Sequence, residues 1–118
     1  MSAPDFELLK LAAQAAKLDF HIDHLDGCPK LIVDGSVWNP LCFDAQALRL
    51  AVILCIHLGL EDTVASAWPA GQMFRAWATE SHGNDPFAAT RRAIVRAAAA
   101  MASIRRRPTS LAYDGGAA

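Results

Sequence analysis

The sequence lacks any apolar run long enough to cross a membrane. Its longest run, residues 50–56, is interrupted at His57, whereas a membrane-spanning helix needs about 20 apolar residues. The N-terminus carries Asp5 and Glu7 before its first base, but a secretory signal places basic residues first and an apolar segment next. We therefore predict neither a transmembrane helix nor a secretion signal, and we expect a cytoplasmic protein.

Cysteine is scarce, and its three positions show no spacing typical of a metal site. The number of cysteines is odd, and no two of Cys28, Cys42 and Cys55 form a Cys-x-x-Cys pair. We therefore expect free thiols. A zinc site would need His57 or His82 to be brought in by the fold. A nucleophile pair of Cys55 with His57 would diverge on a helix, because residues two apart do not share a helix face.

Other catalytic and ligand-binding patterns are missing as well. There is no glycine-rich phosphate loop and no serine-centred elbow. His21 and His24 would point to opposite faces of a strand, which prevents them from binding one metal ion. We predict no catalytic residues, no cofactor and no metal, although a small enzyme stays open as a third alternative.

Charge is unevenly distributed along the chain. Residues 1–62 hold nine acids and four bases, whereas residues 63–118 hold seven arginines and three acids. Opposed charges can support a head-to-tail contact or an acidic binding face, but drift toward Ala and Arg codons gives the same pattern. The net charge of −1 argues against a general nucleic-acid coat protein.

With 118 residues, 53% of them hydrophobic, the chain suits one folded domain. Periodicity and turn signals, including Asp34-Gly35 and the helix start Asp85-Pro86, predict the element order α-β-β-β-α-β-β-α. This is the α+β class: a mostly antiparallel sheet of about four to five strands packed with three helices. We expect the domain at residues 1–107 and a flexible tail at 108–118. The helices are expected at residues 5–17, 44–58 and 86–106, and the strands at 20–25, 30–33, 36–38, 63–68 and 72–79.

The helix expected at residues 44–58 is apolar almost all round. Asp44 would cap it and Gly59 would end it, although a helix end near Leu54 followed by a strand fits the pattern too. Arg49 is its main charge, so one sheet cannot cover all of its apolar surface. We therefore predict a homodimer or higher oligomer, unless the other two helices cover the remaining face.

Two segments resemble a known group of proteins. They are residues 34–44 (DGSVWNPLCFD), which run into residues 47–52, and residues 84–98 (NDPFAATRRAIVRAA). Together they resemble small uncharacterised proteins of tailed phages and prophages, of the NinX-like and phage α-β-α sandwich type, over residues 31–104. The resemblance implies a phage or prophage accessory protein in the bacterial host cytoplasm, where inhibitors of host defence, such as anti-CRISPR proteins, are frequent. That group carries no established catalytic residues.

We therefore expect a non-enzymatic accessory protein that binds a host or phage protein. Trp68 comes before Pro69 at a hairpin tip, so we expect it to be partly exposed, and exposed aromatic residues favour interfaces. The alternative is an accessory nucleic-acid-binding protein that uses the C-terminal arginines, ending in Arg105-Arg106-Arg107. The expected partner-binding residues are Trp68, Arg75, Trp77, Arg91, Arg92 and Arg96.

Overall fold

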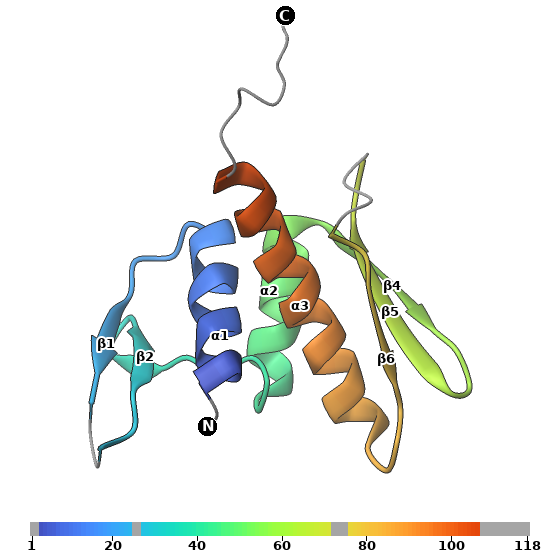
Figure 1. Cartoon of the computed structure of the whole chain (residues 1–118), viewed down its shortest axis with the longest axis horizontal. Helices are drawn as coiled ribbons and strands as arrows, with labels where there is room; N and C mark the ends of the chain where they lie inside the picture. Colours follow the sequence, from blue (N-terminus) through green and yellow to red (C-terminus); the bar gives the residue numbers. More distant parts are fainter. Residues whose placement is uncertain (1–2, 25–26, 72–75, 107–118) are drawn as a thin grey trace, which may run out of the picture.

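The computed structural model describes residues 3–24, 27–71 and 76–106, which form three helices and two three-stranded antiparallel sheets (Figure 1). The predicted α+β class with three helices and antiparallel strands is confirmed, but the strands divide between two sheets. The expected tail at residues 108–118 lies outside the described residues. The elements are α1 (Ala3–Ala15), β1 (His21–Asp23), β2 (Lys30–Val33), β3 (Ser36–Val37), α2 (Asp44–Leu54), β4 (Ile56–Leu60), β5 (Val64–Pro69), β6 (Ala78–Ser81) and α3 (Pro86–Arg106).

Helix α3 lies at the centre of the molecule, between α1 and the β4–β5–β6 sheet (Figure 1). It begins at the predicted residue, because the Asp85 carboxylate accepts hydrogen bonds from the backbone N–H groups of Phe87 and Ala88, each at 3.1 Å. Its contact with α1 is made of small side chains, among them the fully buried Ala13 and Ala97. Small residues let the two helix backbones approach closely, and larger side chains such as Leu11 of α1 and Met101 of α3 pack beside them.

The end of α2 differs from the longer helix that we predicted. Cys55 adopts a left-handed conformation, with φ of 54°, and closes the helix after Leu54. The alternative with a following strand is correct, because β4 pairs with β5 along its whole length, from Ile56 opposite Pro69 to Leu60 opposite Ala65. This pairing outweighs the local helical pattern. Gly59, expected to end the helix, is a strand residue instead.

The first turn of α2 also departs from the predicted cap. Phe43 occupies the N-cap position without a side-chain hydrogen bond, and Asp44 is the first helical residue. An acidic side chain there still suits the positive end of the helix dipole. Asp44 also forms an ion pair with Arg91 of α3, which gives it a role in joining the two helices.

The first sheet, β1–β2–β3, is an antiparallel meander in which a tight turn joins β2 to β3. Asp34 and Gly35, which join β2 to β3, both have positive φ, 52° and 80°, as a type I′ hairpin turn requires. In the second sheet, β6 differs from the strand expected at residues 72–79. Residues 72–75 lie outside the description, and β6 runs from Ala78 to Ser81, where its pairing with β5 extends it two residues beyond the expected end at residue 79.

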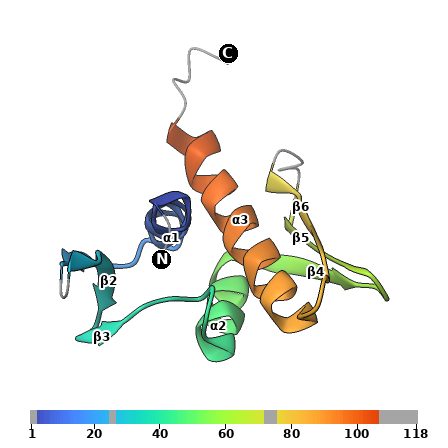
Figure 2. The same ribbon diagram turned by 60° about the horizontal axis from the view of Figure 1, so that its bottom comes forward.

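The two faces of the β4–β5–β6 sheet have different surroundings. The inner face carries Ala65, Ala67 and Ala78, which are buried against α3. No described element covers the outer face (Figure 2). Because α3 packs mainly on β5 and β6, it leaves the inner face of β4 partly open. The molecule therefore presents two surfaces where a binding site can form, one on each face of this sheet.

Candidate functional site

An apolar groove of about 430 Å³ lies between α2, β4 and the first turns of α3. Its walls include Leu48, Leu58 and Ile94, and its rim includes Leu60 and Phe87. The last two are 64% and 69% exposed, which is unusual for residues of this size in a folded domain. The groove therefore offers apolar surface that the described residues leave uncovered.

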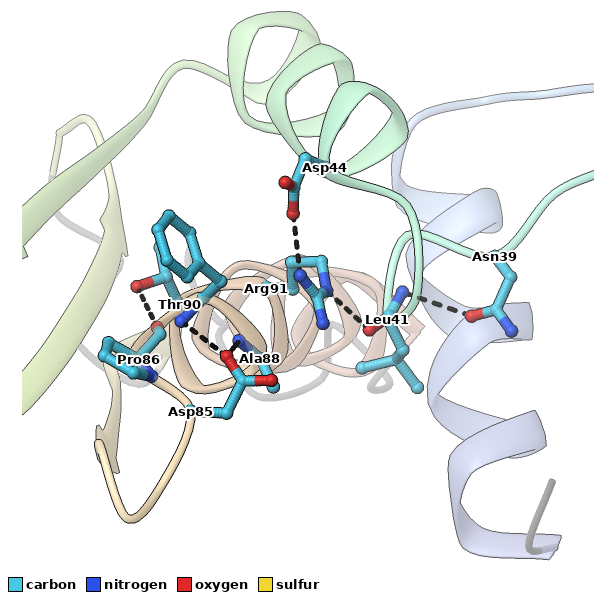
Figure 3. Close-up of polar contacts among 9 residues, drawn as sticks. Asn39, Leu41, Asp44, Asp85, Pro86, Ala88, Thr90 and Arg91 are labelled. Atoms are coloured by element: carbon cyan, nitrogen blue, oxygen red, sulfur yellow. Dashed lines mark hydrogen bonds and ion pairs between the residues drawn. The ribbon is translucent and has the colours of Figure 1, made fainter.

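Polar contacts on one side fix the walls of this groove (Figure 3). Arg91 of α3 donates from Nε to the backbone oxygen of Leu41, at 2.7 Å, and from its guanidinium to Asp44, also at 2.7 Å. Thr90 donates to the backbone oxygen of Pro86 within the first turn of α3. The two contacts of Arg91 connect α3 to the start of α2 and the residues just before it, and so fix the positions of two walls of the groove.

One buried polar atom beside the groove has no hydrogen-bond partner among the described residues. His82 lines the groove, and its Nε2 atom is buried without a hydrogen bond from any described residue. Buried ring nitrogens normally find a hydrogen-bond partner. The His82 Nε2 atom is itself closed off from solvent, so it lies behind the surface of the groove.

The outer face of the same sheet carries a row of three stacked rings, the aromatic row: His57, Trp68 and Trp77. The ring centroids of His57 and Trp68 are 5.8 Å apart, and those of Trp68 and Trp77 are 4.4 Å apart, with the planes within 9° of parallel. Trp77 donates from Nε1 to the hydroxyl of Thr79, and that hydroxyl also shares a hydrogen bond with Ser66. Trp77 is 50% exposed. The row is thus an ordered aromatic surface open to solvent.

Gly59 makes room for this row. A Cβ atom at Gly59 would lie 3.2 Å from the Trp68 ring, closer than ordinary van der Waals contact. The missing side chain lets the indole lie across β4, where it also stacks on His57. This close approach explains a glycine in the middle of a strand, a position that glycine otherwise weakens.

The structure brings together only some of the residues expected to bind a partner. Trp68 and Trp77 are in contact, and Arg75 lies outside the described residues. The three predicted partner-binding arginines of α3 are each held by a carboxylate of a different element: Arg91 by Asp44, Arg92 by Asp5 and Arg96 by Glu80. They join α3 to its neighbours and do not gather beside the tryptophans.

Arg92 forms the most specific of these ion pairs. Two of its nitrogens donate to the two carboxylate oxygens of Asp5, at 3.0 and 3.2 Å. These hydrogen bonds raise the pKa of Arg92 above its ordinary value, despite the opposing effect of burial. The alternative prediction of nucleic-acid binding depends on Arg105, Arg106 and Arg107, whose side chains lie outside the description, and stays a prediction.

Sequence reasoning missed the groove and the part played by His57. Both depend on β4, which we expected to be the last turn of a helix. The available signal was the sequence of residues 56–60, IHLGL, followed by Glu61-Asp62 and a second strand, which together fit a hairpin. The tryptophans were selected by residue type, but their stacking depends on the strand register.

The potential metal ligands of the described residues do not form a cluster. Cys28, Cys42 and Cys55 are exposed free thiols. In residues 3–24, 27–71 and 76–106, no three His, Cys, Asp or Glu side chains gather as metal ligands would. Over the same ranges, the helices are all too short or too polar to span a bilayer. The groove and the aromatic row are the surfaces with distinctive chemistry, and both suit non-covalent contact.

Comparison with known proteins found no relative of this chain. No family model matches the sequence, and neither a curated protein nor a solved structure matches it. The resemblance to small phage and prophage proteins therefore stays a prediction that rests on the two segments quoted for it.

Proposed function

We propose that this protein is a non-enzymatic binding protein that attaches to a surface of a host or phage protein through the aromatic row. The observation that carries the proposal is Trp77, half exposed and stacked on Trp68, on a sheet face that no described element covers. Tryptophan is enriched among the few residues that supply most of the binding energy of protein interfaces. A stacked pair on an open sheet face is a suitable anchor of this kind.

The geometry of the row lowers the cost of binding. Trp68 lies between His57 and Trp77, and the indole N–H of Trp77 already has a hydrogen bond to Thr79. Little side-chain freedom is left for a partner to remove, so the row is preorganised. Burying the exposed half of Trp77 would contribute about 2 kcal/mol, on the usual scale of apolar surface removed from water.

The face around the row suggests what kind of surface it binds. The strand positions beside it include Gly59, Ser66 and Thr79, which carry no charge. Hydroxyl groups next to an aromatic anchor form the polar rim that surrounds many interface hot spots. We infer a partner surface that offers an apolar pocket with few charges.

The predicted phage resemblance supplies the biological setting. In the cytoplasm of a bacterial host, a small protein without catalytic residues acts by occupying a surface of a larger one. Inhibition of a host defence system, as anti-CRISPR proteins do, is the role that this setting suggests. The aromatic row supports the binding part of the proposal, and the resemblance alone supports the setting.

The test is capture of a partner from a bacterial lysate by the tagged protein, compared among matched variants. We expect Trp77→Ala to reduce capture of any specific partner at least tenfold, because it removes the exposed ring. The control is Phe43→Ala, which removes another half-exposed aromatic ring, at the start of α2 and outside this sheet. Equal capture by Trp77→Ala and the unchanged protein, with both folded by circular dichroism, would refute the proposal.

A further inference from the structure

We propose that a second copy of this chain pairs with the first along β4 and covers the apolar groove, forming a two-fold dimer with one continuous six-stranded sheet. The interface uses the edge and the inner face of β4, whereas the aromatic row lies on the outer face, and His57 is the member of the row that belongs to β4 itself. Three features of the described residues point to this occupant: the composition of the β4 edge, the exposed residues on its inner face and the amount of apolar surface.

The first feature is the free edge of β4. Within the described residues, β4 pairs only with β5, so its other edge directs backbone N–H and C=O groups away from the sheet. Natural proteins protect such edges with charged residues, proline or bulges. The sequence of β4, IHLGL, has no Lys, Arg, Asp, Glu or Pro, and its pairing with β5 is continuous. By contrast, the opposite edge strand β6 carries Glu80.

The second feature is the uncovered apolar surface beside that edge. Leu58 and Leu60 are exposed on the inner face of β4, which α3 covers only in part. Leu48 and Val52, one turn apart on α2, are exposed on the neighbouring helix. The same strand thus has both an open edge and an open apolar face. One occupant that adds a strand and brings its own helices covers both.

A second copy fits this geometry. Antiparallel pairing of two β4 strands about an axis perpendicular to the sheet leaves the α3-covered faces of both copies on the same side. With the axis at Leu58, Ile56 lies opposite Leu60 of the second copy, and His57 lies opposite Gly59 of the second copy. Inner-face residues therefore meet only inner-face residues. The two grooves face each other across the axis, and the apolar residues of each copy cover those of the other.

The third feature is the size of the surface. Leu48, Val52, Leu58, Leu60 and Phe87 together expose on the order of 500 Å² of side chain, given their exposed fractions and ordinary side-chain areas. That is near the upper end of the apolar patches found on monomers. A standard interface buries about 800 Å² per partner, and the strand edge and groove rim can supply the remainder.

The dimer would also affect target binding. Both aromatic rows would lie on the same outer face of the six-stranded sheet, so one dimer would present two copies of the proposed binding surface. Two linked sites raise the apparent affinity for a target that displays two matching surfaces. The dimer itself does not depend on the proposed function, because Trp68 and Trp77 take no part in it.

The experiment is light scattering across a range of micromolar concentrations. We expect a mass of about twice 12.7 kDa, reached and then held as the concentration rises. Leu60→Lys should restore a monomer or raise the dissociation constant at least tenfold, because it places a charge in the apolar contact. Val37→Lys, at an exposed apolar position in the other sheet, and Trp77→Ala should both remain dimeric. A mass that stays near 12.7 kDa, or that grows without limit, would overturn the proposal.

Hydrogen exchange gives a second readout that does not need a folded variant. At concentrations where the unchanged protein is dimeric, peptides covering residues 56–60 should exchange more slowly than in dilute solution, because edge N–H groups become hydrogen bonded. A dimer that forms without added protection in this strand would show that the interface lies elsewhere. Loss of partner capture by Trp77→Ala with the dimer intact would separate this proposal from the proposed function.

Discussion

The contact between α1 and α3 and the region around α2 and β4 are built in opposite ways. Between α1 and α3, fully buried alanines such as Ala12, Ala13, Ala93 and Ala97 fill the space between closely packed helices. Around α2 and β4, larger side chains such as Leu48 stay exposed beside an open groove. In the first region small residues complete a contact within the chain. In the second, large exposed residues leave apolar surface that another molecule can cover.

Charged side chains follow the same division. The ion pairs of Arg91, Arg92 and Arg96 all hold α3 to a neighbouring element. Within the described part of the chain, no ion pair involves β4. The side of the molecule around α3 is thus fixed by both packing and charge. The β4 side is held by its pairing with β5 and by the burial of Ile56 in the core, without an ion pair, which is consistent with a role in binding.

The strongest way to break this comparison uses one substitution at two positions of α2. Leu50→Ala removes a side chain that is 1% exposed and should lower the free energy of unfolding by about 2–5 kcal/mol. Leu48→Ala removes one that is 61% exposed and should cost less than about 1 kcal/mol. Denaturant unfolding in dilute solution measures both. Equal losses of unfolding free energy in the two variants would mean that Leu48, in the groove wall, is as fully packed as Leu50, in the core.

Overfilling the alanine contact should have the next largest effect. Ala97→Leu adds three carbon atoms where α3 has no free space, so we expect a loss of about 1–3 kcal/mol in the free energy of unfolding. Ala45→Leu, at an exposed position of α2, is the matched control and should change stability by less than about 0.5 kcal/mol. A tolerated leucine at position 97 would show that α1 and α3 are not closely packed.

Replacing Arg92 by lysine tests the charged part of the comparison. Lysine has one side-chain nitrogen and cannot form the two parallel hydrogen bonds that Arg92 makes to Asp5. We therefore expect Arg92→Lys to lower the free energy of unfolding by about 0.5–1 kcal/mol, and the control Arg49→Lys to leave it nearly unchanged. The raised pKa of Arg92 means that its contribution to stability is complete below the pKa of the unfolded chain and is lost only as pH rises above that value. The loss caused by Arg92→Lys should therefore be constant between about pH 5 and pH 9. Denaturant unfolding at several pH values measures this loss of unfolding free energy. A loss that varies across this pH range would contradict the expectation.

Elements with strong local signals were predictable from the sequence, and elements decided by distant pairing were not. Asp85-Pro86 placed the start of α3 at the correct residue, and Asp34-Gly35 placed a hairpin turn. The end of α2 depends on β4 joining β5, a contact that helical periodicity cannot reveal. For the same reason, Trp68 and Trp77 could be chosen as candidates by residue type, but the stacked row and the groove required the strand register.

The smallest expected effect concerns Gly59, where β4 meets the aromatic row. In Gly59→Ala, the added Cβ would lie 3.2 and 3.3 Å from two atoms of the Trp68 ring, so the ring must shift by a few tenths of an ångström. Alanine reduces the backbone freedom of the unfolded chain, which offsets part of the strain, and the net change in stability should stay within about 0.5 kcal/mol. The shift should be visible in the coupling between the two indoles, because Trp68 stacks directly on Trp77. Far-ultraviolet circular dichroism should show a weaker exciton signal in Gly59→Ala, and no change in Ser81→Ala, an exposed position of β6 on the same face. An unchanged signal in Gly59→Ala would mean that the row adapts freely, and the preorganisation that the proposed binding depends on would be absent.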